Sequence, residues 1–322
     1  MKPAFEAFLA VAEKMSVTRA SEDLHVTQQC VSDHIRRLEQ EYGVRLFERR
    51  PKLQLTDAGL LMQKSLQSVR IIEGNLQQNM ASIARGSQGS FSLGISTSRA
   101  PIILPNVLSR YYSEYPQVSI SFAEDDTQIL EERLLAGRID LFIGINTTPN
   151  ADFEIETVAR EGVMLVISRG LLKQYFTEKE IEKMREGVDL ERFSAIPFTL
   201  FFQTGKVNHA IEEYLNSCHV ALNVRYNISD SRSQIALCTA GVCAAICPKM
   251  LLQSAYQYNL SADDNSYLYM FPVLNFGDKI HIELVGHKNA IHPTYMKRFM
   301  EVVREEVRKI SDESGFWAMP QR

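Results

Sequence analysis

Several common signatures are missing from this sequence of 322 residues. Its five cysteines form no Cys-x-x-Cys pair, which favours buried, reduced thiols over the alternatives of a redox switch or a metal site. The seven histidines are scattered, and no metal ligand set is predicted. No apolar run reaches the roughly 18 residues that a membrane span needs, and Glu6 falls where a secretory signal would be apolar. We therefore predict a cytoplasmic protein without a membrane span.

The chain also lacks a strong excess of either charge. It has 35 Lys and Arg against 39 Asp and Glu, a formal net charge of -4, which excludes a generally basic surface but not a local basic patch. Hydrophobic residues make up 45% and charged residues 23%, so the composition excludes a mostly disordered chain. The length predicts two or three domains.

Catalytic motifs are missing as well. The sequence contains neither a Gly-x-Ser-x-Gly nucleophile motif nor a P-loop. His281 and His287 share one predicted strand, where neighbours on one face are usually structural. We therefore predict that the protein is not an enzyme and needs no cofactor.

The first sixty residues show the period of an α-helix. Apolar residues at i, i+3, i+4 and i+7 from Phe5 predict a first helix, and a short second helix is predicted over residues 19–24. A third helix buries Val31, Ile35 and Leu38. The predicted stops and caps are, in chain order, Met15, Ser16 or Thr18, Thr27 and Gly43.

Two short helices joined by a tight turn form a helix-turn-helix, which places its last helix in the major groove of DNA. Ala20 fits this arrangement, because a larger side chain would push the helices apart. Glutamine pairs with adenine, and arginine reaches guanine or phosphate. The residues predicted to face DNA are Thr18, Thr27, Gln28, Gln29, Ser32, Asp33 and Arg36.

Residues 44–56 follow as two short extended runs around a basic tip, which predicts a β-wing. Arg49, Arg50 and Lys52 at this tip suit contacts with phosphate. Six bases and four acids give residues 28–52 a net charge of +2. On charge alone a solvated, mixed-charge surface explains the segment equally well, but the helix-turn-wing arrangement favours DNA binding.

Residues 16–39, with 43–49 and 55–59 after them, resemble the winged helix-turn-helix of LysR-type transcriptional regulators. Two positions depart from that pattern: Gln29 stands where proline is frequent, and Asp33 stands where a base or an amide is frequent. An acid in the groove repels phosphate but accepts a hydrogen bond from cytosine. The departures therefore affect the expected operator sequence and not DNA binding itself.

The next segment, residues 58–90, is predicted to be a linker helix and hinge. Its heptad seam consists of Met62, Leu66, Val69, Glu73, Leu76, Met80 and Ile83. A long helix with one apolar stripe needs a partner, either its own chain or, as we favour, a second subunit. Residues 85–90 are polar and glycine-containing, which predicts a hinge.

From residue 91 to residue 310, β-like runs alternate with amphipathic helices, which predicts an α/β module with largely parallel sheets. The resemblance implies a two-lobed module like a periplasmic binding protein. It places residues 91–160 and 268–310 in the first lobe and residues 161–267 in the second, with a tail at 311–322. The charged segment 171–192 is expected to be an exposed, solvated helix.

Polar residues directly after predicted strands are candidates for a ligand site, because helix N-termini there attract anions. The expected effector-binding residues are Ser96, Thr97, Ser98, Thr127, Thr147, Phe202 and Gln203. Each could instead cap a helix or fill the core, and the family resemblance favours the ligand role for residues 96–98. Arg99 suits an anion, whereas the acids of residues 124–126 suit a cation, so the charge of the ligand stays open.

The prediction is therefore a LysR-type DNA-binding regulator that responds to a small-molecule effector. Its expected partners are double-stranded DNA, the effector, RNA polymerase and further copies of itself in a homodimer or homotetramer. One alternative is a thiol-based redox regulator, since some members of this family sense oxidants with cysteines. The other is a solute-binding protein, which would not carry a DNA-reading head.

Overall fold

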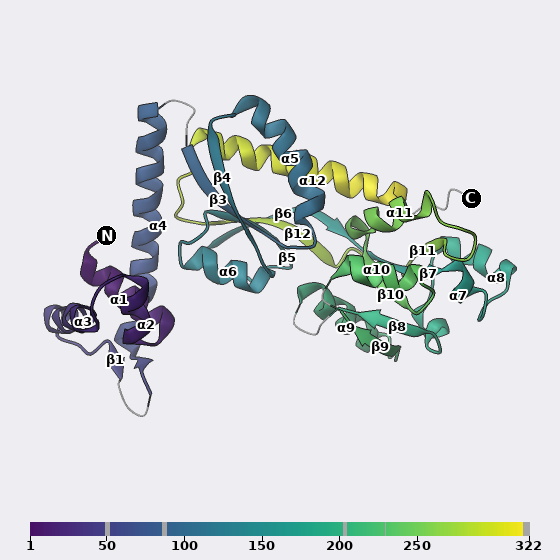
Figure 1. The fold of residues 1–322 in the computed structure, drawn as a ribbon, viewed down its shortest axis with the longest axis horizontal. Helices are drawn as coiled ribbons and strands as arrows, with labels where there is room; N and C mark the ends of the chain where they lie inside the picture. Colours follow the sequence, from purple (N-terminus) through teal and green to yellow (C-terminus); the bar gives the residue numbers. More distant parts are fainter. Residues whose placement is uncertain (49–51, 86–88, 202–204, 229, 318–322) are drawn as a thin grey trace.

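The computed structural model describes residues 1–48, 52–85, 89–201, 205–228 and 230–317. A small helical head lies at one end of the molecule, one long helix leaves it, and two α/β lobes follow side by side (Figure 1). Within these residues, no helix combines the length and the apolar character that crossing a membrane requires.

The head consists of three helices, α1 (Pro3–Lys14), α2 (Val17–Asp23) and α3 (Gln28–Tyr42), with the caps that the sequence predicts. The Ser16 hydroxyl accepts a hydrogen bond from the Arg19 backbone N–H at 3.3 Å. The Thr27 hydroxyl accepts one from the Cys30 N–H at 3.2 Å. Gly43 ends α3 at φ 70°, a conformation that glycine adopts without strain. Ala20 is fully buried, as the close approach of helices requires.

The wing is a two-stranded antiparallel hairpin of β1 (Phe47–Glu48) and β2 (Gln54–Leu55). One carboxylate oxygen of Glu39 on α3 accepts hydrogen bonds from the backbone N–H groups of Leu46 and Phe47 at 2.9 and 3.4 Å. The Phe47 ring lies 5.3 Å from the Phe8 ring of α1. Glu39 and Phe8 therefore hold the wing at a fixed angle to the recognition helix.

The long helix α4 (Asp57–Arg85) begins at Thr56, whose hydroxyl accepts a hydrogen bond from the Gly59 N–H at 3.0 Å. Its predicted apolar seam is divided. Met62 and Leu66 pack into the core of the head, because the first turns of α4 cross the head before leaving it. Further along, the exposed apolar side chains are Val69, Ile72, Leu76 and Met80. Only this second part is free to pair with another subunit. The side chain of Ile83 and residues 86–88 of the predicted hinge lie outside the part of the chain that the structure describes.

The head and α4 also contact the first lobe. The Arg70 guanidinium on α4 donates a hydrogen bond to the Ala136 carbonyl at 3.2 Å. Lys64 forms an ion pair with Asp152 at 3.2 Å. Arg138, two residues after the Ala136 carbonyl, forms an ion pair with Glu13 of α1.

The first lobe is a five-stranded sheet in the order β4-β3-β5-β12-β6. Its strands are β3 (Gly89–Ile95), β4 (Val118–Glu124), β5 (Leu141–Ile145), β6 (Phe153–Glu161) and β12 (Ile280–His287). Its helices are α5 (Ala100–Glu114), α6 (Thr127–Leu135) and α12 (Thr294–Trp317). The closing helix thus continues beyond residue 310, where a tail was expected.

The second lobe is a five-stranded sheet in the order β11-β7-β10-β8-β9. Its strands are β7 (Val163–Ser168), β8 (Pro197–Leu200), β9 (Asn223–Asn227), β10 (Ala244–Pro248) and β11 (Leu268–Pro272). Its helices include α7 (Arg169–Leu172), α8 (Glu178–Lys183), α9 (Lys206–Ser217), α10 (Ser231–Thr239) and α11 (Gln253–Asn259). A 3-10 turn, η3 (Lys249–Leu252), follows β10 directly.

Two expectations about these sheets are wrong. Both sheets are mixed, because β12 runs antiparallel to β5 and β6, and β7 runs antiparallel to β10 and β11. The second lobe also ends later than residue 267, since β11 pairs with β7 along its whole length. The chain therefore crosses between the lobes at Gly162, between β6 and β7, and again over residues 273–279, between β11 and β12. Hydrophobic patterns locate strands but carry no information about their direction or their neighbours.

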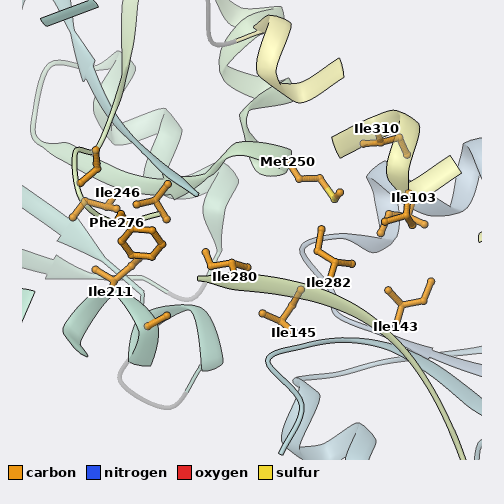
Figure 2. Close-up of a cluster of buried hydrophobic side chains, with 14 of the residues drawn as sticks. Ile103, Ile143, Ile145, Ile211, Ile246, Met250, Phe276, Ile280, Ile282 and Ile310 are labelled. Carbon is orange, nitrogen blue, oxygen red and sulfur yellow. The ribbon is translucent and has the colours of Figure 1, made fainter. Parts of the chain in front are cut away.

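The charged segment 171–192 is not the solvated helix that its composition predicts. It folds as part of α7, α8 and two 3-10 turns, and its apolar residues join the core of the second lobe. The buried members are Leu171, Leu172, Ile181, Met184, Val188 and Leu190. That core continues across both lobes. Figure 2 shows Ile280 between Ile145 and Ile282 on one side and Phe276 and Ile211 on the other, with Met250 above Ile282.

Candidate functional site

The predicted DNA-reading residues that the structure describes lie on α2, on α3 and beside the wing. Gln28, Gln29 and Arg36 on α3 are exposed, and Ser32 and Asp33 are half-buried between them. Thr18 is exposed on α2. Thr27 is also exposed, and its hydroxyl acts as the cap of α3. The polar face of α3 is thus open to solvent from its first turn onward.

Asp33, the unexpected acid, has a partner on its own helix. The Arg36 guanidinium donates to the Asp33 carboxylate at 3.3 Å, and the side chains of Arg36 and Asp33 are 64% and 45% exposed. This pair reduces the repulsion between Asp33 and phosphate. It engages only one nitrogen of the Arg36 guanidinium, whose other N–H groups can still donate to a base or a phosphate.

At the wing, Lys52 is exposed beside the hairpin. The predicted phosphate contacts Arg49 and Arg50 lie outside the described residues. Glu39 is a structural member of this region that sequence reasoning missed. Its only signal was an acid on the otherwise buried side of α3, three residues from the end of the helix.

The second candidate site is a cavity of about 400 Å³ between the two lobes. The loop between β3 and α5, the start of α6 and the end of β5 line it on one side, and residues around α9 and η3 line it on the other. Four predicted effector residues meet here, namely Ser96, Thr97, Ser98 and Thr127. Thr147 is not among the described residues that line the cavity, and its backbone N–H donates to Glu283 at 2.6 Å. Phe202 and Gln203 lie outside the described residues.

Three buried polar atoms along this cavity have no hydrogen-bond partner among the described residues. They are the Ser96 hydroxyl, Nε of Arg99 and Oδ1 of Asn208. The exposed fractions of these residues are 9%, 1% and 1%. By contrast, the Thr127 hydroxyl accepts a hydrogen bond from the Ile145 N–H at 3.0 Å. Thr127 therefore fixes the start of α6 against β5 and also borders the cavity.

Arg99 connects the cavity to the crossing between the lobes. Its Nη2 donates to Glu161, the last residue of β6, and both side chains are buried. The other carboxylate oxygen of Glu161 accepts a hydrogen bond from the Met250 N–H of the second lobe at 2.6 Å. Glu161 thus binds one group from each lobe beside the first crossing. Sequence reasoning named Arg99 but gave no signal for Glu161.

A second cation, Lys206, reaches the cavity from α9. Its ammonium donates to the Thr148 hydroxyl at 2.7 Å and lies 3.6 Å from Glu131. Asp126 and Glu132 also border the cavity, but both are exposed. Lys206 and Asn208 were missed from the sequence, where the only signal was the helix start after Gly205.

The three cysteines of the second lobe sheet and of α10 are buried. A hydrogen bond with Cys243 and burial raise the pKa of the Cys238 thiol. Burial and the nearby Glu161 raise the pKa of Cys247 to about 12. These two thiols are therefore protonated at neutral pH, which makes them poor nucleophiles toward an oxidant.

Two family patterns match this chain. Residues 4–60 match the bacterial regulatory helix-turn-helix protein of the lysR family, and residues 84–308 match the LysR substrate binding domain. The chain belongs to the LysR family. It is a LysR-type DNA-binding transcriptional regulator with an effector-binding domain, and this family consists of regulators and not of enzymes.

Known proteins resemble this LysR-type chain over most of its length. The transcriptional activator CmpR of Synechocystis sp. is 27% identical over 71% of this chain and 72% of its own. The uncharacterized regulator YcgK of Bacillus subtilis is 22% identical over 94% of both chains. A full-length OxyR variant from Pseudomonas aeruginosa has a TM-score of 0.64 at 17% identity, covering 99% of this chain and 97% of that one. Full-length CbnR, crystallised with its target DNA, has a TM-score of 0.55 at 22% identity, covering 94% and 98%.

Proposed function

We propose that this LysR-type regulator binds a partly palindromic operator through α3 and the wing, and that a small-molecule effector in the interlobe cavity controls this binding. The observation that carries the DNA half is the open polar face of α3, which a helix-turn-helix presents to the major groove. The CbnR structure with its target DNA has the same fold. The observation that carries the effector half is that three residues lining the cavity, Ser96, Arg99 and Asn208, have buried polar atoms without a hydrogen-bond partner among the described residues.

The proposed assembly is a homodimer or a homotetramer. Val69, Ile72, Leu76 and Met80 repeat on α4 at spacings of three and four residues and are 44–55% exposed. A second α4 would cover this stripe, and pairing of two heads would match two half-sites of an operator. RNA polymerase is a further proposed partner at the promoter. The buried, protonated thiols of Cys238 and Cys247 do not favour the thiol-based redox alternative, whereas the hydrogen bond with Cys238 lowers the pKa of Cys243.

DNA binding is tested by fluorescence anisotropy of the full chain with labelled duplexes over a series of salt concentrations. Lys52→Ala should weaken binding to every duplex and reduce the slope of log K against log salt by about 1. Lys179→Ala, an exposed lysine on α8, is the matched control and should change neither quantity. Equal behaviour of the two variants would contradict the phosphate contact assigned to the wing.

The effector is tested by thermal melting against organic acids, amino acids and aromatic metabolites. A ligand at 100 times its Kd stabilises the folded state by about 2.7 kcal/mol if it binds only that state. Ser98→Ala should remove the shift, whereas Thr147→Val, outside the cavity lining, should retain it. A shift that persists in Ser98→Ala and disappears in Thr147→Val would move the effector site away from the cavity.

A further inference from the structure

The polar groups that line the cavity restrict the chemistry of its ligand. Arg99 carries no acceptor, so its Nε–H, unpartnered among the described residues, can only donate. The Ser96 hydroxyl beside it is also free to donate to a ligand. A buried donor without a partner costs free energy, and a ligand that accepts from it recovers that cost. The first-lobe wall of the cavity therefore favours an acceptor-rich group.

Two helix N-termini strengthen this preference. The helices α6 and α9 both begin at the cavity, at Thr127 and Lys206. The N-cap residue of α6, Asp126, makes no side-chain capping hydrogen bond, and that of α9, Gly205, has no side chain to make one. Backbone N–H groups at such ends, together with the helix dipole, stabilise an anion. The N-terminus of α6 thus adds to the donors of the first-lobe wall, and the N-terminus of α9 makes the second-lobe wall compatible with an anion nearby.

The acids around the cavity do not oppose an anion strongly. Glu161 is neutralised by Arg99 and hydrogen-bonded to Met250. Glu131 accepts a hydrogen bond from the Thr148 N–H at 2.7 Å and lies near Lys206. The acids among the described lining residues, Asp126 and Glu132, are exposed on α6, where water and salt screen them.

Asn208 adds the opposite requirement on the second-lobe wall. Its Nδ2 donates to the Glu212 carboxylate at 2.7 Å, and a carboxylate can only accept, so the orientation of the amide is fixed. Oδ1 is then a buried acceptor without a partner among the described residues. It needs a hydroxyl or an amine from the ligand. Between the two polar walls, the apolar lining residues are Ile129, Ile145, Phe201, Val207 and Leu251.

We infer that the effector is an organic carboxylate with an apolar body and a separate hydrogen-bond donor. Its carboxylate lies against Ser96, Arg99 and the N-terminus of α6, and its donor binds Oδ1 of Asn208. This inference rests on the proposed effector site in the cavity and adds the chemical class of the ligand, which the sequence left open.

Four small probes separate the two requirements, with binding to the full chain measured by ligand-observed NMR titration. 4-Hydroxybenzoate and 4-aminobenzoate carry both groups and differ in the donor. 4-Methoxybenzoate lacks the donor, and 4-hydroxybenzamide lacks the charge. The first two should bind, and the last two should bind at least about tenfold more weakly, the loss expected for one strong hydrogen bond. Different affinities for the first two would identify the preferred donor.

Asn208→Ala should remove the advantage of 4-hydroxybenzoate over 4-methoxybenzoate, while Thr147→Val should preserve it. The comparison of probes on the unmodified chain remains informative even if Asn208→Ala folds poorly. Equal binding of 4-hydroxybenzamide and 4-hydroxybenzoate would overturn the inference, as would failure of all four probes at about 10 mM. A neutral ligand that Ser96→Ala weakens would preserve the cavity as the effector site while refuting the carboxylate class.

Discussion

The two binding regions of this regulator are built in opposite ways. The proposed DNA-reading surface is centred on α3, whose polar side chains are exposed or half-buried. The interlobe cavity combines residues 96–99, 126–129 and 205–208 with Glu132, Ile145, Phe201 and Leu251, and polar atoms of Ser96, Arg99 and Asn208 along it are buried. Because the exposed side chains of α3 lie outside the core, substitutions there can change recognition without changing stability. A cavity made from distant segments uses the same side chains for both tasks.

Arg99 is a side chain with both tasks, folding and ligand binding. It lines the cavity and also holds Glu161 at the crossing between the lobes. Gln28, by contrast, lies exposed on the first turn of α3. A substitution at Arg99 should therefore change both stability and effector binding, whereas a substitution at Gln28 should change DNA recognition alone.

The largest effect is expected for Arg99→Met, which leaves the Glu161 carboxylate buried without its ion-pair partner. Loss of one member of a buried pair costs about 3–5 kcal/mol. The free energy of unfolding of the effector-binding module, measured in urea, should fall by this amount. Glu161→Gln retains an acceptor for the Met250 N–H but leaves the Arg99 guanidinium buried without its counter-charge, so it should also destabilise the module. Equal stability of Arg99→Met and the unmodified protein would refute the structural role of the pair.

Two glycines on α4 test how tightly the head is built. A Cβ at Gly59 would overlap the backbone carbonyl oxygen of Leu46, whereas a Cβ at Gly74 would meet nothing within 4 Å. Gly59→Ala should destabilise the head by about 1–3 kcal/mol, as overpacking does. Gly74→Ala should stabilise the helix by about 0.5–1 kcal/mol. Thermal unfolding, monitored by circular dichroism, measures both changes. Equal shifts in melting temperature would show that the structure around Gly59 adjusts to the added Cβ.

On the recognition helix, Gln28→Ala should alter which duplexes are preferred without changing the stability of the head. A good base contact contributes about 1–3 kcal/mol of discrimination between bases. Selection from a randomised duplex library, followed by anisotropy, measures the change. Gln40→Ala, exposed near the other end of α3, is the matched control. Equal losses on every duplex would exclude a base contact by Gln28.

The smallest effect concerns pH. Burial lowers the pKa of His292 and His287 in the first lobe. Because their folded pKa values lie below the unfolded value of about 6.5, the unfolded chain binds more protons at acidic pH. Their contribution to stability is complete above that value and is lost as the pH falls below it. His292→Gln should reduce the fall in unfolding free energy between about pH 7 and about pH 5, and an unchanged slope would exclude His292 as a contributor.

Local features of the fold could be predicted well. The caps at Ser16 and Thr27, the stop at Gly43 and the small residue Ala20 all follow from contacts within a few residues. Features that depend on distant contacts could not. The direction of β12, the sheet to which β11 belongs and the burial of Ile181 were expected differently, since each depends on a neighbour far along the chain.

The sequence by itself determined the family, the recognition helix and four of the residues around the cavity, because periodicity, capping and turn chemistry act over short distances. Only the tertiary structure decided that Ser96, Arg99 and Asn208 meet in one cavity, and that Glu161 joins the two lobes. Only it divided the α4 seam into a part that packs into the head and a part left exposed. Burial and pairing are properties of the folded chain, so a list of residues cannot specify them.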